Sequence, residues 1–280
     1  MKKHAGKDHR EVYPDKQQQW ELERKNLKEL LQKHGAEVLE PRNLKPEEKQ
    51  LHPNNGYANF FCRDPFFVIG DYVIEASMRF LHRRHEVWPL RDLLWSLTLD
   101  TPCTYLAALF PEISSIDDLT LGIGPFIEGG DVLVLDKHIL VGNSGFASND
   151  LGIKWLRKLL SPKGYTVESV RLHPDILHLD CALGLVRGNL MVVCKEALLD
   201  GIPTILKTWK SIEVTLEEAG QLATNGLPIS SDLYLTDPEF EHIGAQIEKE
   251  GVKVEYVDFQ ISRSFGGAFR CTTQALRRED

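Results

Sequence analysis

The strongest constraint on the fold is a unit of two short apolar strands, a helix and a further strand that recurs along the chain. Residues 66–76 contain two apolar runs around Gly70-Asp71, the usual signal of a tight β-hairpin. At least three such units are expected. Their strand pairs cover 66–76, 131–142 and 177–194, and the helices that follow them cover 82–97, 148–160 and 202–209. The spacing, about 50 to 60 residues, indicates a structural repeat in an α/β protein.

The sequence also predicts where two of these helices are interrupted or capped. The first helix should be interrupted near Pro89, and the second should be capped by Ser148 or Asn149. Units with exposed apolar faces must pack together, and closing them into a ring is one way to remove the sheet edges. An ordinary open α/β sheet is the alternative that this pattern leaves open.

The N-terminal part differs from the repeats. Residues 1–19 are polar and are expected to form a loose arm, residues 20–35 an amphipathic helix and residues 36–40 a short strand. Turn-forming residues then dominate 41–59. We therefore predict a polar N-terminal arm over 1–19 and a single domain over 20–280.

Composition excludes several classes of protein. The chain has 280 residues and is 42% apolar, enough for a sizeable core, and no stretch approaches the ~20 uncharged apolar residues of a membrane span. Its N-terminus lacks an apolar signal segment, so we expect a soluble cytoplasmic protein. The five cysteines are odd in number and widely spaced, so neither a disulfide framework nor a thiolate zinc site is expected.

Charge narrows the expected partners. The formal net charge of −8 disfavours nucleic acid and favours a cationic small molecule, although residues 81–85 could form a local basic patch. The histidines lack convincing ligand spacing, and no phosphate-binding glycine fingerprint is present. We therefore predict no metal and no organic cofactor.

Two motifs in the middle of the chain carry polar residues that could act together. In a strand over 177–181, His178 and Asp180 would point to one face, about 6–7 Å apart. A solvated polar face explains this motif more simply. In Glu128-Gly-Gly-Asp131, the glycines let a ligand or another segment come close, although an ordinary acidic turn explains the motif as well.

The segment 265–273 is the best candidate for a nucleophile. Its Gly-Gly pair precedes Cys271, which follows Arg270 directly, and an adjacent cation favours the thiolate form that attacks electrophiles. Most lone cysteines are inert core residues, which is the expectation for Cys103, Cys181 and Cys194.

A fourth motif, Cys62-Arg63-Asp64-Pro65, precedes the first hairpin, and a surface ion pair is its default explanation. Taken in order, the four motifs resemble those of the guanidino-group-modifying enzymes: the arginine deiminases, dimethylargininases and amidinotransferases. Residues 68–78 and 149–157 resemble the glycine and inosamine-phosphate amidinotransferases most. The similarity runs from about Val12 to Arg278.

This resemblance implies a particular α/β architecture. The family fold is a five-bladed α/β propeller of pseudo-fivefold strand-strand-helix-strand repeats around a negatively charged active-site channel. The first blade is expected to be incomplete, because nothing apolar enough to begin it precedes Trp20. Residues 20–280 would form one catalytic domain, and a homodimer is an assembly that the resemblance leaves open.

The resemblance also implies a role for each motif. By match of motif, Cys271 is the nucleophile, His178 is the general acid and base, and Glu128 is the carboxylate that orients the histidine. Asp64 and Asp180 are the pair of carboxylates that binds the guanidinium. Asp131 and Arg63 are further substrate-binding residues. A guanidinium is a poor electrophile, so its chemistry needs carboxylates that match its charge, a thiolate and an acid for the departing nitrogen.

The expected activity is cleavage of a C–N bond of arginine or an analogue through a covalent amidino intermediate on Cys271, with transfer of the amidino group to an amine. Hydrolysis by the same residues, giving citrulline or urea-type products, is the alternative. A cysteine peptidase or amidase would need an oxyanion hole in place of guanidinium-binding carboxylates. A non-catalytic propeller that acts as a binding module is the remaining alternative.

Overall fold

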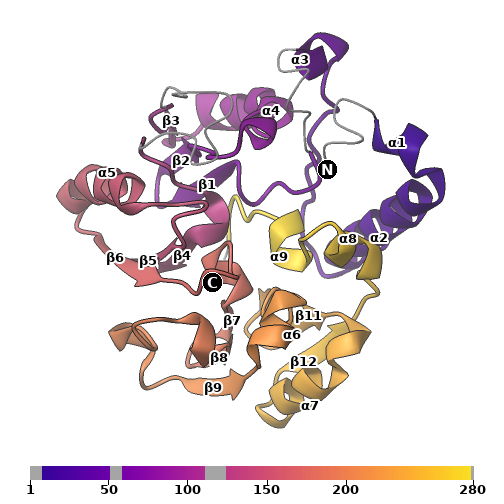
Figure 1. The fold of residues 1–280 in the computed structure, drawn as a ribbon, viewed down its shortest axis with the longest axis vertical. Coiled ribbons are helices and arrows are strands. Elements are labelled where there is room, and N and C mark those ends of the chain that lie inside the picture. The colour runs from indigo at the N-terminus through magenta and orange to yellow at the C-terminus, as the bar shows by residue number, and fades with distance from the viewer. Residues whose placement is uncertain (1–7, 51–58, 111–123, 279–280) are drawn as a thin grey trace. The chain divides into compact units, whose positions relative to one another are not determined.

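The computed structural model describes residues 8–50, 59–110 and 124–278 of the chain (Figure 1). These residues group into two compact units. The His178 unit comprises Pro41–Leu179 and Thr273–Asp280, and the Cys271 unit comprises Met1–Glu40 and Asp180–Thr272. No helix within the described ranges is both long and apolar enough to cross a bilayer.

Each unit contains two three-stranded sheets of the same topology: an antiparallel hairpin whose second strand pairs in parallel with a third. In the His178 unit the sheets are β1 (Phe66–Ile69), β2 (Tyr72–Glu75) and β3 (Thr104–Ala107), and β4 (Val132–Leu135), β5 (His138–Asn143) and β6 (Thr166–Arg171). In the Cys271 unit they are β7 (Leu183–Arg187), β8 (Leu190–Val193) and β9 (Lys210–Glu213), and β10 (Leu227–Ser230), β11 (Leu233–Thr236) and β12 (Lys253–Tyr256).

The parallel pairing explains why a helix or helical turn follows each hairpin. A strand can join a parallel neighbour only by a crossover that returns to the starting edge. The crossovers are α4 (Trp88–Leu99), α5 (Asp150–Leu160), the 3₁₀ turn Thr204–Leu206 and α7 (Glu241–Lys249). The mixed α/β repeat is thus confirmed, and the described residues hold a fourth repeat, over 227–256, that the sequence analysis did not recognise. A count of five blades stays a prediction.

The remaining helical elements are short, apart from one. They are α1 (His9–Val12), α2 (Pro14–Lys33), α3 (Pro46–Gln50), α6 (Leu216–Gly220), α8 (Gln260–Ser264) and α9 (Phe269–Thr272), with 3₁₀ turns at Leu81–Arg83, Gly129–Asp131, Ser161–Lys163, Leu179–Cys181, Lys195–Ala197 and Pro238–Phe240. The long helix α2 packs against α8 within the Cys271 unit.

Turn chemistry sets the predicted hairpins. Gly70 in the β1–β2 turn and Asp136 in the β4–β5 turn have φ of 56° and 52°, a left-handed conformation that glycine, asparagine and aspartate adopt at low cost. Asn189 does the same between β7 and β8, with φ of 67°. The hairpins over 66–76 and 131–142 were therefore predicted correctly.

Helix α5 shows how a helix is fixed on its sheet. The Asn149 side chain accepts a hydrogen bond from the Gly152 N–H at 3.0 Å, so Asn149 is the predicted N-cap. A side chain at Gly152 would place its Cβ 1.8 Å from the Phe126 carbonyl oxygen, so glycine is required for this close approach. The apolar face of α5 then packs on β5, where Ile139 and Val141 are fully buried.

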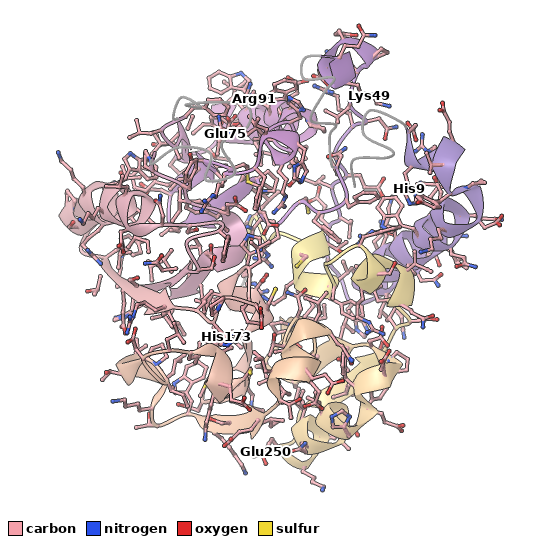
Figure 2. All side chains as sticks on the ribbon, in the orientation of Figure 1. His9, Lys49, Glu75, Arg91, His173 and Glu250 are labelled. Atoms are coloured by element: carbon pink, nitrogen blue, oxygen red, sulfur yellow. The ribbon has the colours of Figure 1, made fainter. Side chains whose placement is uncertain are left out.

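Helix α4 is tied to its own sheet by an ion pair. Arg91 Nε and Nη2 each donate to one oxygen of Glu75 in β2 at 2.7 Å, and the Tyr105 hydroxyl of β3 donates to the same carboxylate. Figure 2 labels Arg91 and Glu75. The helix begins at Trp88 with Pro89 in its first turn, so the predicted helix over 82–97 starts late. Proline suits this first turn because the N–H that it lacks has no partner there.

Three other expectations about elements were wrong. Helix α2 begins at Pro14 instead of Trp20, because proline opens it and good helix formers follow, so part of the expected loose arm is helical. Residues 36–40 form no strand, since no described strand pairs with them. Helix α3 lies inside the expected loop 41–59, of which 51–58 fall outside the described residues.

The largest error concerns 177–181, which form no strand. Strand β6 ends at Arg171 and Leu179–Cys181 make a 3₁₀ turn, while the first strand of the third hairpin is β7. His178, Leu179 and Asp180 are all buried, so the alternation of polar and apolar residues does not separate a solvent face from a core face. The helix predicted over 202–209, in the same repeat, is only the 3₁₀ turn Thr204–Leu206.

Candidate active site

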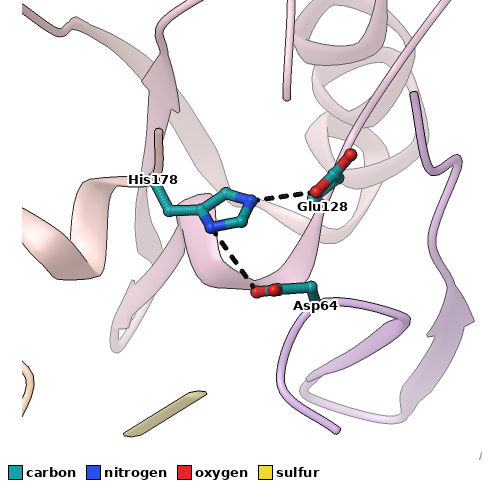
Figure 3. A group of neighbouring side chains, drawn as sticks. All are labelled: Asp64, Glu128 and His178. Atoms are coloured by element: carbon teal, nitrogen blue, oxygen red, sulfur yellow. Dashed lines mark hydrogen bonds and ion pairs between the residues drawn. The ribbon is translucent and has the colours of Figure 1, made fainter. Parts of the chain in front are cut away.

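Three buried side chains from separate segments meet in the His178 unit (Figure 3). His178, after β6, places Nε2 2.9 Å from Glu128 Oε2 and Nδ1 3.8 Å from Asp64 Oδ1. Asp64 comes from the segment before β1, and Glu128 from the segment before β4. The His178 unit therefore brings together three residues that sequence motifs had singled out separately.

The two glycines after Glu128 make this meeting possible. A Cβ at Gly130 would lie 2.4 Å from Asp64 Oδ1 and 2.9 Å from His178 Cγ. A Cβ at Gly129 would lie 2.1 Å from the Arg63 carbonyl oxygen. Both distances to oxygen are shorter than any real Cβ contact, so the Gly-Gly pair lets the segments carrying the carboxylate and the imidazole close in.

Asp131 fixes the backbone around the cluster. Its Oδ1 accepts from the Leu179 N–H at 2.9 Å and its Oδ2 from the Ser148 N–H at 3.1 Å. Burial raises the pKa of Asp131 to about 7, against the lowering influence of His178 and Ser148. This geometry supports the position of His178 through the neighbouring Leu179, so Asp131 has a structural contact that the motif alone did not indicate.

Arg83 completes the cluster, and the sequence analysis missed it. Its guanidinium donates to Asp64 Oδ2 at 2.6 Å, to Glu128 Oε2 at 3.3 Å and to both oxygens of Glu86 at 2.8 and 2.9 Å. Arg83 belongs to the run 81–85, for which the sequence left a local basic patch open, but four of those five residues are buried. Only the positive charges of the run gave any signal from sequence.

The buried charges determine the protonation states. Burial alone would lower the pKa of His178, but Asp64, Glu128 and Asp131 raise it well above its ordinary value. Burial likewise opposes ionisation of Asp64, yet the charges of His178 and Arg83 hold its pKa below the ordinary value. Both shifts favour an imidazolium at His178 beside an ionised Asp64, which suits a proton donor.

Asp64, Glu128 and His178 could also hold a metal ion, since each offers one ligand atom and these atoms lie within 4.8 Å of one another. Arg83 and the protonated His178 already compensate the two carboxylates. A metal ion would have to displace both contacts. The donor set therefore fits proton transfer better than metal binding.

The sequence motifs placed Arg63 beside the substrate. In the structure, the Arg63 side chain contacts Gln274. Its Nη1 donates to Gln274 Oε1 at 2.6 Å, and Gln274 Nε2 donates back to the Arg63 carbonyl at 3.2 Å and to that of Phe66 at 2.8 Å. These bonds anchor the segment that carries Asp64. A direct role for Arg63 in binding substrate stays a prediction.

The Cys271 unit brings the other two candidates, Asp180 and Cys271, into one hydrogen-bonded network. Asp180 lies in the 3₁₀ turn Leu179–Cys181, fully buried, and Arg270 Nε lies 4.0 Å from its Oδ2. Cys271 is buried in α9, and its N–H donates to Asn225 Oδ1 at 3.2 Å. Asn225, which no motif marked, is the link between the two segments.

The other cysteines fit their predicted role in part. All five are free thiols. Cys181 and Cys194 are buried, as expected of core residues, whereas Cys103 is half-buried.

Comparison with known proteins assigns the chain to a family. The family model described as N,N dimethylarginine dimethylhydrolase, eukaryotic, matches residues 4–278, and the chain belongs to this family. The resemblance to guanidino-group-modifying enzymes is thereby confirmed.

Two relatives match this chain along most of their own length. The uncharacterized protein YkgA of Bacillus subtilis (strain 168) is 29% identical over 255 residues, which cover 90% of this chain and 78% of the relative. The putative inosamine-phosphate amidinotransferase 2 of Streptomyces griseus is 28% identical over 291 residues, covering 95% of this chain and 82% of the relative.

A solved structure supports the fold. SxtG, an amidinotransferase of Microseira wollei from the saxitoxin biosynthetic pathway, matches with a TM-score of 0.84 at 22% identity, over 95% of this chain and 85% of the other. At this identity the likeness establishes the mixed α/β fold and no more.

Proposed function

We propose that the protein cleaves a C–N bond of a guanidino substrate, arginine or an analogue, and passes the amidino group to an amine through a covalent intermediate on Cys271. The observation that carries this proposal is the buried imidazolium of His178 between the carboxylates of Glu128 and Asp64. Such a group can protonate a departing amine in a site that also offers negative charge to a guanidinium.

Each step follows from one of these groups. The Cys271 thiolate adds to the central guanidinium carbon, and the tetrahedral adduct collapses when His178 gives its Nδ1 or Nε2 proton to the departing nitrogen. The alkylamine leaves and the amidino group stays on sulfur. An incoming amine then attacks the amidino carbon, gives a proton back to His178 and releases the Cys271 thiolate, so protons and electron pairs balance.

Asp64 can still bind a cation although Arg83 occupies one of its oxygens. Arg83 donates to Oδ2, and Oδ1 has no hydrogen-bond donor within the described residues. Oδ1 is therefore the atom of Asp64 that a substrate N–H would meet. Asp180 supplies the second carboxylate in this proposal.

Hydrolysis is the second candidate function, and the family match favours it. Water, with His178 as the base, would attack the S-amidino intermediate in place of an amine and release urea and the Cys271 thiolate; an intermediate that keeps the alkyl nitrogen on its carbon would instead release a ureido compound. If ammonia or a methylated amine leaves first, the product is a ureido compound such as citrulline.

The wider organisation belongs to the same proposal. We infer a five-bladed α/β propeller whose first blade is incomplete, with residues 20–280 acting as one catalytic domain. A cytoplasmic location and assembly as a homodimer are consistent with it.

Mass spectrometry of the purified protein tests the proposal. The protein is incubated with arginine or dimethylarginine, with and without glycine, and both the acid-quenched protein and the small products are followed. Ornithine with an adduct of about +42 Da on the Cys271 peptide, the mass of an added amidino group, would establish amidino cleavage, and guanidinoacetate would establish transfer.

The other outcomes are equally informative. Citrulline with ammonia or dimethylamine would mean hydrolysis. Cys271→Ala is the control that must abolish both adduct and product. The absence of product and adduct with every donor would contradict the proposal for these substrates.

A further inference from the structure

Asn225 lies in the loop between α6 and β10 of the Cys271 unit and is fully buried. Its Oδ1 accepts from the Cys271 N–H at 3.2 Å, its Nδ2 donates to the Asp180 carbonyl at 3.3 Å, and its own carbonyl accepts from the Arg270 N–H at 3.2 Å. Asp180 and Cys271 are 91 positions apart in sequence (271 minus 180), and one side chain bonds both.

We propose that Asn225 is a positioning residue that fixes the Cys271 segment relative to Asp180. This inference rests on the proposed function, in which Cys271 attacks a guanidinium that Asp180 helps to hold. Attack requires the reacting atoms about 3–3.5 Å apart, and a misplacement near 1 Å can cost about a hundredfold in rate. A bond from one side chain to both segments restricts such a displacement.

Only an amide of this length serves both segments. The Cys271 N–H needs an acceptor and the Asp180 carbonyl needs a donor, and asparagine carries one of each at the same end. A carboxylate would lack the donor and an apolar side chain would lack both. Because the site is buried, the Cys271 N–H would lose its hydrogen bond without gaining one from water, and the Asp180 carbonyl would keep only the bond from Thr224 Oγ1.

The loop that presents Asn225 is itself tightly held. A Cβ at Gly184 of β7 would lie 2.2 Å from the Thr224 carbonyl oxygen, so β7 packs directly on this loop. A Cβ at Gly226 would lie 2.4 Å from the Tyr234 hydroxyl oxygen of β11. The loop has little room to shift, which suits a residue whose role is to hold others in place.

The backbone before Asn225 shows the same constraint. Leu222 has φ of 72°, a left-handed conformation that is costly for a bulky residue, and its carbonyl accepts from the Asn225 N–H at 3.0 Å. The loop therefore keeps a conformation that its sequence alone does not favour. The surrounding contacts, including those of Asn225, must supply the compensating stabilisation.

Thr224 provides a matched control. Its Oγ1 donates to the same Asp180 carbonyl at 3.1 Å and, among the described residues, makes no hydrogen bond to the Cys271 segment. Thr224→Val therefore loosens Asp180 alone, whereas Asn225→Ala loosens Asp180 and Cys271 together. Asn225→Asp, of the same shape, keeps an acceptor for the Cys271 N–H and removes the donor to Asp180.

The experiment combines hydrogen exchange of the peptide that contains Cys271, steady-state kinetics and thermal unfolding. Asn225→Ala should expose the Cys271 peptide to faster exchange and lower kcat about a hundredfold. Thr224→Val should leave that exchange unchanged and mainly raise KM, and Asn225→Asp should retain most of the protection at Cys271. Thermal unfolding identifies any variant that is lost to misfolding.

Equal exchange at Cys271 in Asn225→Ala and Thr224→Val, or a wild-type kcat in Asn225→Ala, would overturn the inference. If the wild-type protein turns over no guanidino compound, the proposed function fails, yet the exchange comparison still decides whether Asn225 holds Cys271. If Asn225→Ala does not fold, loss of protection in the isosteric Asn225→Asp counts against the proposal, and retained protection supports it.

Discussion

At the scale of single residues, the buried charged side chains of the His178 unit are paired with opposite charges. Asp64, Glu86 and Glu128 surround Arg83, and the imidazolium of His178 adds a second positive charge. Isolated charges would be expensive to bury, whereas these are paired at hydrogen-bond distance. Burial nevertheless raises the pKa of Glu86 to about 7, whereas the pKa of Asp64 is lowered by the charges of His178 and Arg83.

The roles assigned to single residues predict a graded mutant series. Cys271→Ala removes the nucleophile and His178→Ala the proton donor, so either should abolish turnover. Asp180→Asn should mainly raise KM, because it removes one negative charge from the guanidinium site. Cys194→Ala, at the buried position directly after β8, is the control and should leave kcat nearly intact. Equal activity of the four variants in a product assay would refute the assigned site.

The raised pKa of His178 predicts a direction for pH dependence. Its stabilising contribution is complete below the unfolded-state pKa, about 6.5, and is lost as pH rises through the higher folded-state pKa. NMR titration of the imidazole should therefore give a midpoint well above that of an unfolded histidine. Glu128→Gln should move this midpoint down, because an anion at 2.9 Å is replaced by a neutral amide.

The same protein unfolded in urea serves as the reference for this titration. A wild-type midpoint at or below about 6.5, the ordinary value for histidine, would contradict the protonated state on which the proposed mechanism depends. No change in Glu128→Gln would show that Glu128 does not control the histidine.

Residues that stand in short sequence motifs could be predicted as site residues, whereas residues that support them through distant contacts could not. Glu128, His178 and Asp64 meet in the structure, and each stood in a short motif that the sequence analysis had singled out. Arg83 and Asn225 carry no such local signal, because their importance arises from contacts with residues far away in the sequence. Only the folded chain identifies them.

At the scale of elements, the N-terminal helix α2 holds the segment that leads to Cys271. Glu23 accepts from the N–H groups of Ile261 and Ser262 at 2.7 and 2.9 Å and from the Ser262 hydroxyl at 2.6 Å. A carboxylate at the start of α8 also lies at the positive end of the helix dipole. Arg24 donates to the Thr272 hydroxyl, next to Cys271.

Glu23→Gln should therefore weaken the Cys271 unit. A neutral amide has one oxygen where the carboxylate uses two, so we expect a loss of about 1–3 kcal/mol in unfolding free energy, as for other broken buried hydrogen bonds. Urea denaturation measures this loss, and hydrogen exchange of residues 260–264 locates it.

Glu29→Gln, on the exposed side of the same helix, is the matched control, since its ion pair with Lys25 is exposed. It should change stability by less than about 0.5 kcal/mol. Similar losses in the two variants would argue against a specific contact between α2 and α8.

Elements with local signals were predicted well, and elements decided by distant contacts were not. The hairpins around Gly70 and Asp136 and the cap at Asn149 depend on conformations that their own residues favour. The segment 177–181 has the alternation of a strand, but it is enclosed on all sides and makes a 3₁₀ turn. The strand expected over 36–40 has no described partner strand.

At the scale of the whole molecule, the repeat expected at least three times from sequence occurs four times in the described residues. The fourth sheet, β10–β11–β12, was missed because Pro228 interrupts the alternation in its first strand, where the register also shifts. The net charge of −8 fits the proposed preference for cationic substrates. The family assignment extends over residues 4–278, so the resemblance applies to both units.

The pairing of α2 with the end of the chain has a consequence for synthesis on the ribosome. Glu23 and Arg24 emerge early, yet their partners Ile261 and Thr272 follow 238 and 248 positions later. At about 5–20 residues per second, α2 waits roughly 12 to 50 s for these contacts. The nascent helix must stay soluble without them during this time, and its surface, on which charged and glutamine side chains predominate, suits that delay.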